Sequence, residues 1–188
     1  PHLLALYAFN VEVARIRDAV TEPHLGLIRL QWWRDTVESL SDGGAGGGHP
    51  VAEALGRAIA EGGLPKQALL DLITAHEFDL YQDQMPDVTA LEVYLGETNS
   101  RLIQMAAMIL DQASAPKVSE AAGLAGVAHG LALLLGDPRH RGPFLPPGLD
   151  VAAAIAHAER RLREAQALFP ALPKSALPAF LPASLTQT

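Results

Sequence analysis

Residues 119–135 read SEAAGLAGVAHGLALLL, a segment whose apolar residues occupy every side of a helix. A helix that is apolar all round has to be covered by other elements, so we expect this one at the centre of a helical bundle. The apolar run Gly123–Gly136 is shorter than the ~18 residues that a membrane-spanning helix needs, and it carries His129. We therefore expect a core helix that does not cross a bilayer by itself.

Six further helices are predicted around it from the apolar spacing and from the prolines and glycines that interrupt that spacing. Thr89, with Glu92 three residues later, has the pattern of a capping box, which predicts a helix start there. Residues 136–149, GDPRHRGPFLPPGL, hold too many prolines and glycines for a helix. The proline-broken tail after residue 168 is expected to lie over the bundle as short turns or to dock elsewhere. The predicted helices are Leu3–Ile16, Leu25–Leu40, Pro50–Ala60, Lys66–Gln82, Thr89–Leu110 and Val151–Leu168.

The composition favours a single all-α domain. The 188 residues are 49% hydrophobic but only 5% aromatic, and β-branched residues are sparse beside Ala and Leu. Unbranched side chains lose little rotamer freedom on a helix, which favours packed helices over sheets. The formal net charge of −7 argues against nucleic acid as a partner, because phosphate contacts need an excess of Lys and Arg. The absence of Cys excludes disulfides and thiolate-bound zinc.

The acidic and histidine residues do not predict a metal site. A Mg²⁺ ion that holds a diphosphate needs two or more carboxylates on one helical face, and Glu12 and Asp18 are not three or four residues apart. We expect Glu12 to form an ordinary ion pair with Arg15. None of the seven histidines has HxxxH or HExxH spacing. His129 is expected to be a core histidine with a backbone partner, and a role as a base is the alternative.

Two other clusters suggest contacts without chemistry. The adjacent Trp32 and Trp33 point about 100° apart on a helix, so at most one can lie fully in the core. The other is expected to stack, with Arg29 or Arg34 as cation–π partners. PRHRG, residues 138–142, concentrates basic groups in a loop that could hold a phosphate or an anionic headgroup, and a solvated loop is the ordinary alternative.

Several segments, in order along the chain, resemble the squalene/phytoene synthase family of head-to-head prenyl transferases. The resemblance implies an all-α isoprenoid-synthase bundle with a central cavity, in which active members hold Mg²⁺ ions and an allylic diphosphate between two aspartate-rich helices. The segments are YAFNVEVARIRDAV (7–20), GLIRLQWWRDTVE (26–38), HPVAEAL (49–55), LLDLITAHEFDL (69–80), TALEVYLGET (89–98) and the LP of PFLPPGL (143–149).

The residues that match the family's metal-binding motifs have mostly lost their carboxylates. Ala14, Arg15 and Asp18 stand at the first aspartate-rich motif, so only Asp18 remains acidic. The second motif falls on AHGLALLLGD, where Ala132 replaces an Asn and the Asp position is Gly136 or Asp137. An Arg-Tyr pair that follows the match to Asp79 and Leu80 in active members reads Gln84 and Met85 here. The vestigial catalytic positions are therefore Ala14, Arg15, Asp18 and Asp137.

The resemblance is nearest to the non-catalytic branch of the family, which includes an assembly factor of mitochondrial respiratory complex I and its bacterial relatives. It implies one squalene/phytoene synthase-like domain over 1–188, truncated at both ends and with residues missing around 136–150. It also implies a lipid- or protein-binding role, no cofactor, and an isoprenoid or other lipid in the cavity. The ligand-binding candidates are Tyr7, Arg15, Asp18, Asp79, Tyr94 and His129.

Other readings remain open at this point. Respiratory-complex subunits are the expected partners, and the expected location is cytoplasmic and peripheral to the inner membrane, or mitochondrial in a eukaryote. The main alternative is an active Mg²⁺-dependent prenyl transferase that uses farnesyl or geranylgeranyl diphosphate. A third is peripheral membrane attachment through PRHRG and the apolar tail.

Overall fold

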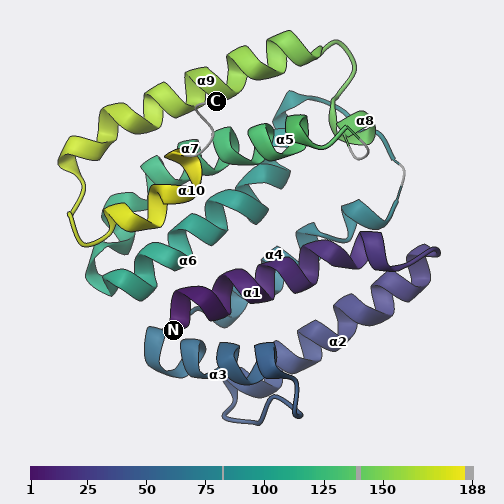
Figure 1. The fold of residues 1–188 in the computed structure, drawn as a ribbon, viewed down its shortest axis with the longest axis vertical. Coiled ribbons are helices and arrows are strands. Elements are labelled where there is room, and N and C mark those ends of the chain that lie inside the picture. The colour runs from purple at the N-terminus through teal and green to yellow at the C-terminus, as the bar shows by residue number, and fades with distance from the viewer. Residues whose placement is uncertain (82, 139–140, 185–188) are drawn as a thin grey trace. The chain divides into compact units, whose positions relative to one another are not determined.

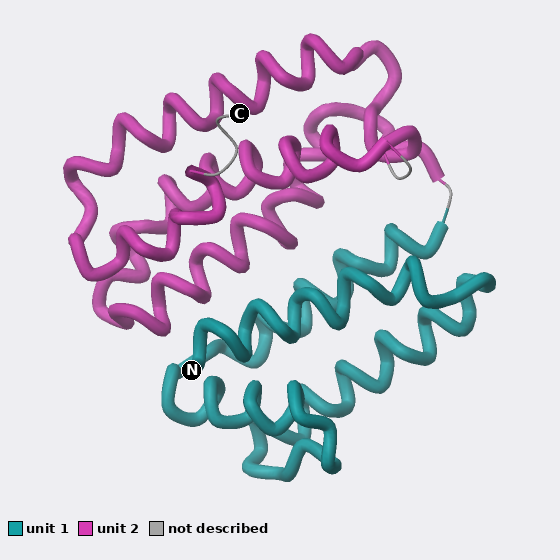
Figure 2. The backbone as a smooth tube through the Cα atoms, viewed as in Figure 1, with its two compact units in different colours: residues 1–81 teal, residues 82–188 magenta. Residues whose placement is uncertain are grey.

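The computed structural model describes residues 1–81, 83–138 and 141–184, which are helical throughout their regular parts. The chain divides into two compact units, residues 1–81 and 82–188, and each is described by itself (Figure 2). The predicted all-α class is confirmed in both. The prediction of one domain over 1–188 stays a prediction.

Unit 1 is built from four helices (Figure 1), and the side chains buried between them are mostly aliphatic. α1 packs on α3, and α2 packs on both α3 and α4. Short 3-10 turns follow α1 at Arg15–Ala19 and α4 at Phe78–Leu80. The helices are α1 (His2–Ala14), α2 (Pro23–Ser41), α3 (Pro50–Gly62) and α4 (Lys66–Ala75). The fully buried large side chains are Leu6, Phe9, Val13, Leu30, Leu55, Leu69, Leu72 and Ile73.

α4 ends seven residues before the predicted Gln82, so that bound was wrong. Nδ1 of His76 lies 2.7 Å from Oδ2 of Asp79, and this local contact accompanies a change to a 3-10 turn. Tyr81 has extended backbone, with φ −107° and ψ 155°, which stops the helix there. The end of α3 follows the expected rule, because Gly63 adopts the left-handed conformation that glycine tolerates best.

Unit 2 is arranged around α7 (Ala115–Gly136), which contacts α5, α6, α9 and α10. The prediction of a central helix in this part of the chain is confirmed. The segment 112–136 is long and apolar enough to cross a membrane by length and composition, but half of its most apolar window is buried by its neighbours. The other helices are α5 (Val88–Leu95), α6 (Arg101–Leu110), α8 (Arg141–Phe144), α9 (Val151–Leu168) and α10 (Leu181–Ser184).

Two predictions about unit 2 were wrong. The N-cap of α5 is Asp87 and not Thr89, because Oδ1 of Asp87 accepts a hydrogen bond of 2.8 Å from the backbone N–H of Ala90. Within the region 136–149, where no helix was expected, residues 141–144 form the single turn α8. Within this turn, the backbone carbonyl of Pro143 accepts a hydrogen bond from the backbone N–H of Met85.

The predicted helix Thr89–Leu110 is interrupted by a π-helical segment, Gly96–Ser100, between α5 and α6. This segment packs against α7 at Gly126, where an added Cβ would lie 2.3 Å from the Cα of Ser100. Only glycine permits that approach. The proline-broken tail forms 3-10 turns and α10, which contact α6 and α7. The tail therefore lies over the helices of unit 2 as short turns, which was the first of its two predicted arrangements.

Candidate functional site

The vestigial first motif lies where α1 gives way to the 3-10 turn of unit 1. Ala14 is the last residue of α1 and is half-buried, while Arg15 and Asp18 lie in the turn and are exposed. A 3-10 turn has three residues per turn instead of 3.6, so it changes the direction of each side chain after Ala14. Arg15 and Asp18, which are three residues apart, therefore lie on one face of the turn, so the cation lies on the same side as the one remaining acid of the motif.

Arg15 lines a pocket of about 500 Å³ that belongs entirely to unit 1. We call it the Arg15 pocket. Arg15 comes from the turn after α1, whereas Arg29 and Trp32 come from α2, and His49 is the N-cap residue of α3. Nδ1 of His49 accepts a hydrogen bond of 3.4 Å from the backbone N–H of Ala52. The lining residues are Glu12, Arg15, Ile16, Ala19, Arg29, Trp32, Trp33 and His49.

The two tryptophans divide as the sequence predicts. Trp33 is 4% exposed and meets Phe9 edge-on, with ring centroids 5.2 Å apart, whereas Trp32 is 43% exposed. Trp32 packs its ring against Trp33 and His49. Arg34, one of its two predicted cation–π partners, instead forms an ion pair with Glu77.

The expected ion pair between Glu12 and Arg15 is not formed among the described residues, so that prediction was wrong. Both side chains line the Arg15 pocket, and neither meets an opposite charge within ion-pair distance there. The 3-10 turn that begins at Arg15 replaces the α-helical geometry on which a pairing three residues apart depends. The pocket thus presents unpaired cationic and anionic groups.

Asp79, one of the predicted ligand-binding residues, is buried and paired within unit 1. Its side chain is 3% exposed and lies 2.7 Å from Nδ1 of His76, which is itself 7% exposed. Burial of a carboxylate is costly unless it is hydrogen-bonded, and the imidazole supplies that bond. Asp79 is therefore placed to hold the 3-10 turn after α4.

The remaining ligand-binding candidates are each half-buried. Tyr7 lies on α1, and burial raises the pKa of its phenol. In unit 2, Tyr94 on α5 packs against Phe144 of α8 with ring centroids 5.1 Å apart. His129 lies on α7, and burial lowers the pKa of its imidazole. Its Nδ1 has no hydrogen-bond partner among the described residues, so the backbone partner expected for this histidine is not found at that nitrogen.

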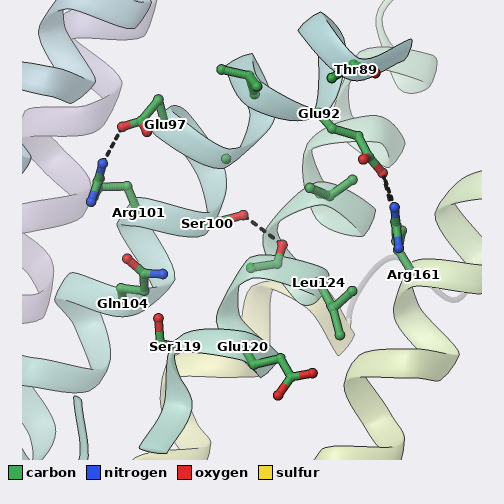
Figure 3. Close-up of a pocket in the computed structure, with 14 residues that line it drawn as sticks. Thr89, Glu92, Glu97, Ser100, Arg101, Gln104, Ser119, Glu120, Leu124 and Arg161 are labelled. Carbon is green, nitrogen blue, oxygen red and sulfur yellow. Dashed lines mark hydrogen bonds and ion pairs between the residues drawn. The ribbon is translucent and has the colours of Figure 1, made fainter. Parts of the chain in front are cut away.

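A groove of about 530 Å³ lies between helices of unit 2 (Figure 3). We call it the Glu92 groove, and sequence reasoning did not find it. Glu92 of α5 receives hydrogen bonds from Nε2 of His157 and Nε of Arg161 on α9, both at 2.7 Å. These residues are more than sixty positions apart, so no local motif could indicate the cluster. The groove is lined by residues of α5, the π-helical segment, α6, α7 and α9, including Glu92, Glu97, Ser100, Arg101, Gln104, Glu120 and Arg161.

The charges of the Glu92 groove are largely neutralised within it. Burial alone would raise the pKa of Glu92, but the hydrogen bonds from His157 and Arg161 outweigh it and lower that pKa. Hydrogen bonds to Glu164 and Glu92 raise the pKa of Arg161. Glu97 pairs with Arg101 on the opposite side of the groove (Figure 3). Carboxylates that are already paired in this way are poor metal ligands, because a metal would have to displace a guanidinium.

No group of three or more His, Asp or Glu residues that could hold a metal ion occurs in the described residues. At the second motif, Ala132 is half-buried on α7 and Asp137 follows the end of that helix. In the loop PRHRG, residues 139 and 140 lie outside the described residues. The anion site predicted for this loop therefore stays a prediction.

Comparison with known proteins gives the following relatives. A family model described as squalene/phytoene synthase matches residues 1–139. NADH dehydrogenase (ubiquinone) complex I, assembly factor 6, is 31% identical to the chain over 204 residues in Bos taurus and 30% over 205 residues in Homo sapiens. These matches cover 94% and 95% of this chain but 60% and 61% of the relatives. The chain thus spans about three fifths of the length of these curated relatives.

Two solved structures share the fold. Squalene synthase HpnC from Alicyclobacillus acidocaldarius superposes with a TM-score of 0.77 at 19% identity, covering 100% of this chain and 80% of that one. A dehydrosqualene synthase crystallised in complex with ligand has a TM-score of 0.75 at 17% identity, covering 99% and 73%. Identities this low establish the fold and carry no argument about chemistry.

Proposed function

The chain belongs to the squalene/phytoene synthase family, and from that membership we propose that it is a member without prenyl-transferase activity that acts as an assembly factor for respiratory complex I. The relatives named as complex I assembly factors, at 30–31% identity, support this role. The proposal extends to this chain what those names say of longer proteins.

The observation that carries the proposal is the loss of acidic groups at the first metal-binding motif. The family resemblance requires carboxylates at the positions of Ala14 and Arg15, and a guanidinium now stands at the second of them. A carboxylate within about 4 Å of a divalent ion attracts it by several kcal/mol, and a cation at the same position repels it by a similar amount. Departure of a diphosphate depends on metal ions that neutralise its growing charge, so this exchange opposes catalysis.

The other carboxylates considered as site residues do not compensate. Asp79 is buried against His76, and Glu92 is held by His157 and Arg161. Each of these acids already has a cationic or hydrogen-bonding neighbour that a metal would have to displace. We accordingly propose that the chain needs no Mg²⁺ or other cofactor for its role.

We further propose that the chain binds a lipid or a protein and does not transform it. An isoprenoid or other lipid is the ligand that the family resemblance suggests, and the proposed contact residues are Tyr7 within unit 1 and Tyr94 and His129 within unit 2. The half-buried state of all three supports a contact role, since each combines an apolar ring with a polar tip. Subunits of complex I are the proposed protein partners, at the inner membrane of a bacterium or of a mitochondrion.

The alternative function is an active head-to-head prenyl transferase. The observation in its favour is the match of residues 1–139 to the family model described as squalene/phytoene synthase. It would require ligands other than the lost aspartates to bind Mg²⁺. Asp18 is the remaining acid of the first motif. An active enzyme would need its carboxylate for Mg²⁺, whereas the assembly role would not.

The proposal is tested by deleting the chain's gene in its own organism and measuring assembled complex I on native gels. We expect complex I to fall, and to recover equally with the wild-type chain and with Asp18→Ala, because no metal site depends on that carboxylate. Asp71→Ala on α4, an acidic position outside both motifs, serves as the matched control. Undiminished complex I in the deletion strain would refute the assembly role. Recovery with wild type and Asp71→Ala but not with folded Asp18→Ala would favour the enzyme.

A further inference from the structure

An apolar stripe on α2 runs beside the Arg15 pocket. Leu25, Ile28 and Trp32 are 42%, 63% and 43% exposed, and their spacing places them on one side of the helix. Arg29 falls on the same side, so the stripe is continuous with the pocket through Arg29 and Trp32. Scattered apolar residues on a surface are ordinary, but three in helical register beside a cationic pocket are not.

The cations of this pocket lack partners within unit 1. Neither Arg15 nor Arg29 has an ion pair or a hydrogen bond from its side chain among the described residues. Both are exposed, and Glu12 is the acidic residue that lines the same pocket. Guanidinium groups match the geometry of phosphate oxygens through paired N–H donors. The pocket therefore offers a local excess of positive charge to a phosphate.

We propose that the Arg15 pocket and the α2 stripe form a docking face for a membrane that contains anionic phospholipid. The headgroup phosphate is held by Arg15 and Arg29, while Trp32, Ile28 and Leu25 enter the boundary between headgroups and acyl chains. Tryptophan favours this depth because its ring is apolar and its N–H is polar. The proposal rests on unit 1 alone and stands whether or not the chain assembles complex I.

The chain's net charge of −7 does not prevent this contact. At physiological ionic strength exposed charges farther away than about 8 Å are largely screened, so the groups nearest the lipid phosphates dominate. Asp35, farther along α2, accepts a hydrogen bond from Gln31. Basic residues beside an apolar side favour a helix that lies in the plane of the membrane. Over its N-terminal half α2 supplies one arginine, Arg29, beside the apolar stripe, and the turn after α1 supplies a second, Arg15.

Tryptophan fluorescence gives a direct test, because the chain has only two tryptophans and Trp33 is already buried. On adding vesicles of phosphatidylcholine and phosphatidylglycerol we expect the emission of the wild-type chain to shift to shorter wavelength. We expect no such shift in Trp32→Phe, in which the remaining tryptophan is shielded before and after. An equal shift in both proteins, or none in the wild type, would overturn the proposal.

Flotation with the same vesicles tests the charges. The double variant Arg15→Gln/Arg29→Gln should bind more weakly by about fivefold for each arginine, and Arg57→Gln, an exposed arginine of α3 outside the pocket, should bind like the wild type. Ile28→Ser should weaken binding, whereas Leu4→Ser, exposed on α1, should not. Equal binding by the double variant and Arg57→Gln would contradict the proposal. So would binding of free glycerol 3-phosphate to the pocket without binding to the vesicles.

Discussion

Replacing Gly126 with Ala tests the contact between α7 and the π-helical segment that organises unit 2. An added Cβ would lie 2.3 Å from both the Cα and the backbone N of Ser100. Ordinary contact begins near 3.4 Å, so the two backbones would have to separate by about 1 Å or distort. The obstacle is backbone and not the tip of a side chain, so it cannot rotate away.

The magnitude follows from two opposing effects. Alanine in a helix interior is favoured over glycine by about 1 kcal/mol. Overpacking a tight contact costs about 1–3 kcal/mol or more, and a backbone obstacle favours the upper part of that range. We therefore expect Gly126→Ala to lower the free energy of unfolding by about 1–2 kcal/mol.

Gly123 supplies the matched control on the same helix, because a Cβ there meets no atom within 4 Å. Gly123→Ala should raise the free energy of unfolding by up to about 1 kcal/mol through helix propensity alone. Urea denaturation followed by circular dichroism measures both variants against the wild type. The reasoning would be refuted if Gly126→Ala were as stable as Gly123→Ala.

Three further predictions concern the polar side chains. Glu92→Gln should lower the free energy of unfolding by about 1–2 kcal/mol at pH 7. Because the pKa of Glu92 is lowered in the folded chain, the carboxylate stabilises the fold above the ordinary pKa of 4.5 and loses this effect as the pH falls below it. The urea midpoints of variant and wild type should therefore converge in acid, and a constant difference between them would contradict this prediction. Asp79→Ala should cost about 1–3 kcal/mol by leaving Nδ1 of His76 buried without its partner, and an unchanged thermal midpoint would argue against that contact. His129→Leu should be neutral or stabilising by about 1 kcal/mol at pH 7, since it removes a buried nitrogen without a partner. Burial lowers the pKa of His129, so the wild type should lose stability as the pH falls through 6.5 while the variant does not. Parallel pH profiles of the two proteins would show that burial does not lower this pKa.

Local signals in the sequence predicted most helix positions. Val151–Leu168 was predicted with both bounds correct, and Asp150 caps its start by accepting a hydrogen bond of 2.7 Å from the N–H of Ala153. The start and end of α3 also follow local signals, because Pro50 stands at its first turn and Gly63 at its C-cap. The start of α5 was missed because Asp87 and Thr89 are both competent caps, and only the hydrogen bond to Ala90 distinguishes them.

Features that depend on distant residues were not predictable in this way. The π-helical turn at 96–100 packs against Gly126, and no local pattern in ETNS indicates it. The Glu92 groove joins α5 to α9 through His157 and Arg161, far along the chain. Arg15 was recognised as a lost ligand, but its place beside Arg29 and Trp32 required the packing of α1 on its neighbours. The loss of carboxylates, in contrast, is a property of the sequence itself.

The most direct test of the lost metal cage is diphosphate release from farnesyl and geranylgeranyl diphosphate in the presence of Mg²⁺, with an active dehydrosqualene synthase as the positive control. We expect release by this chain to equal that of the protein-free blank, with no C30 or C40 product. Diphosphate released with coupled product, and abolished by Asp18→Ala or by chelation of Mg²⁺, would contradict the account.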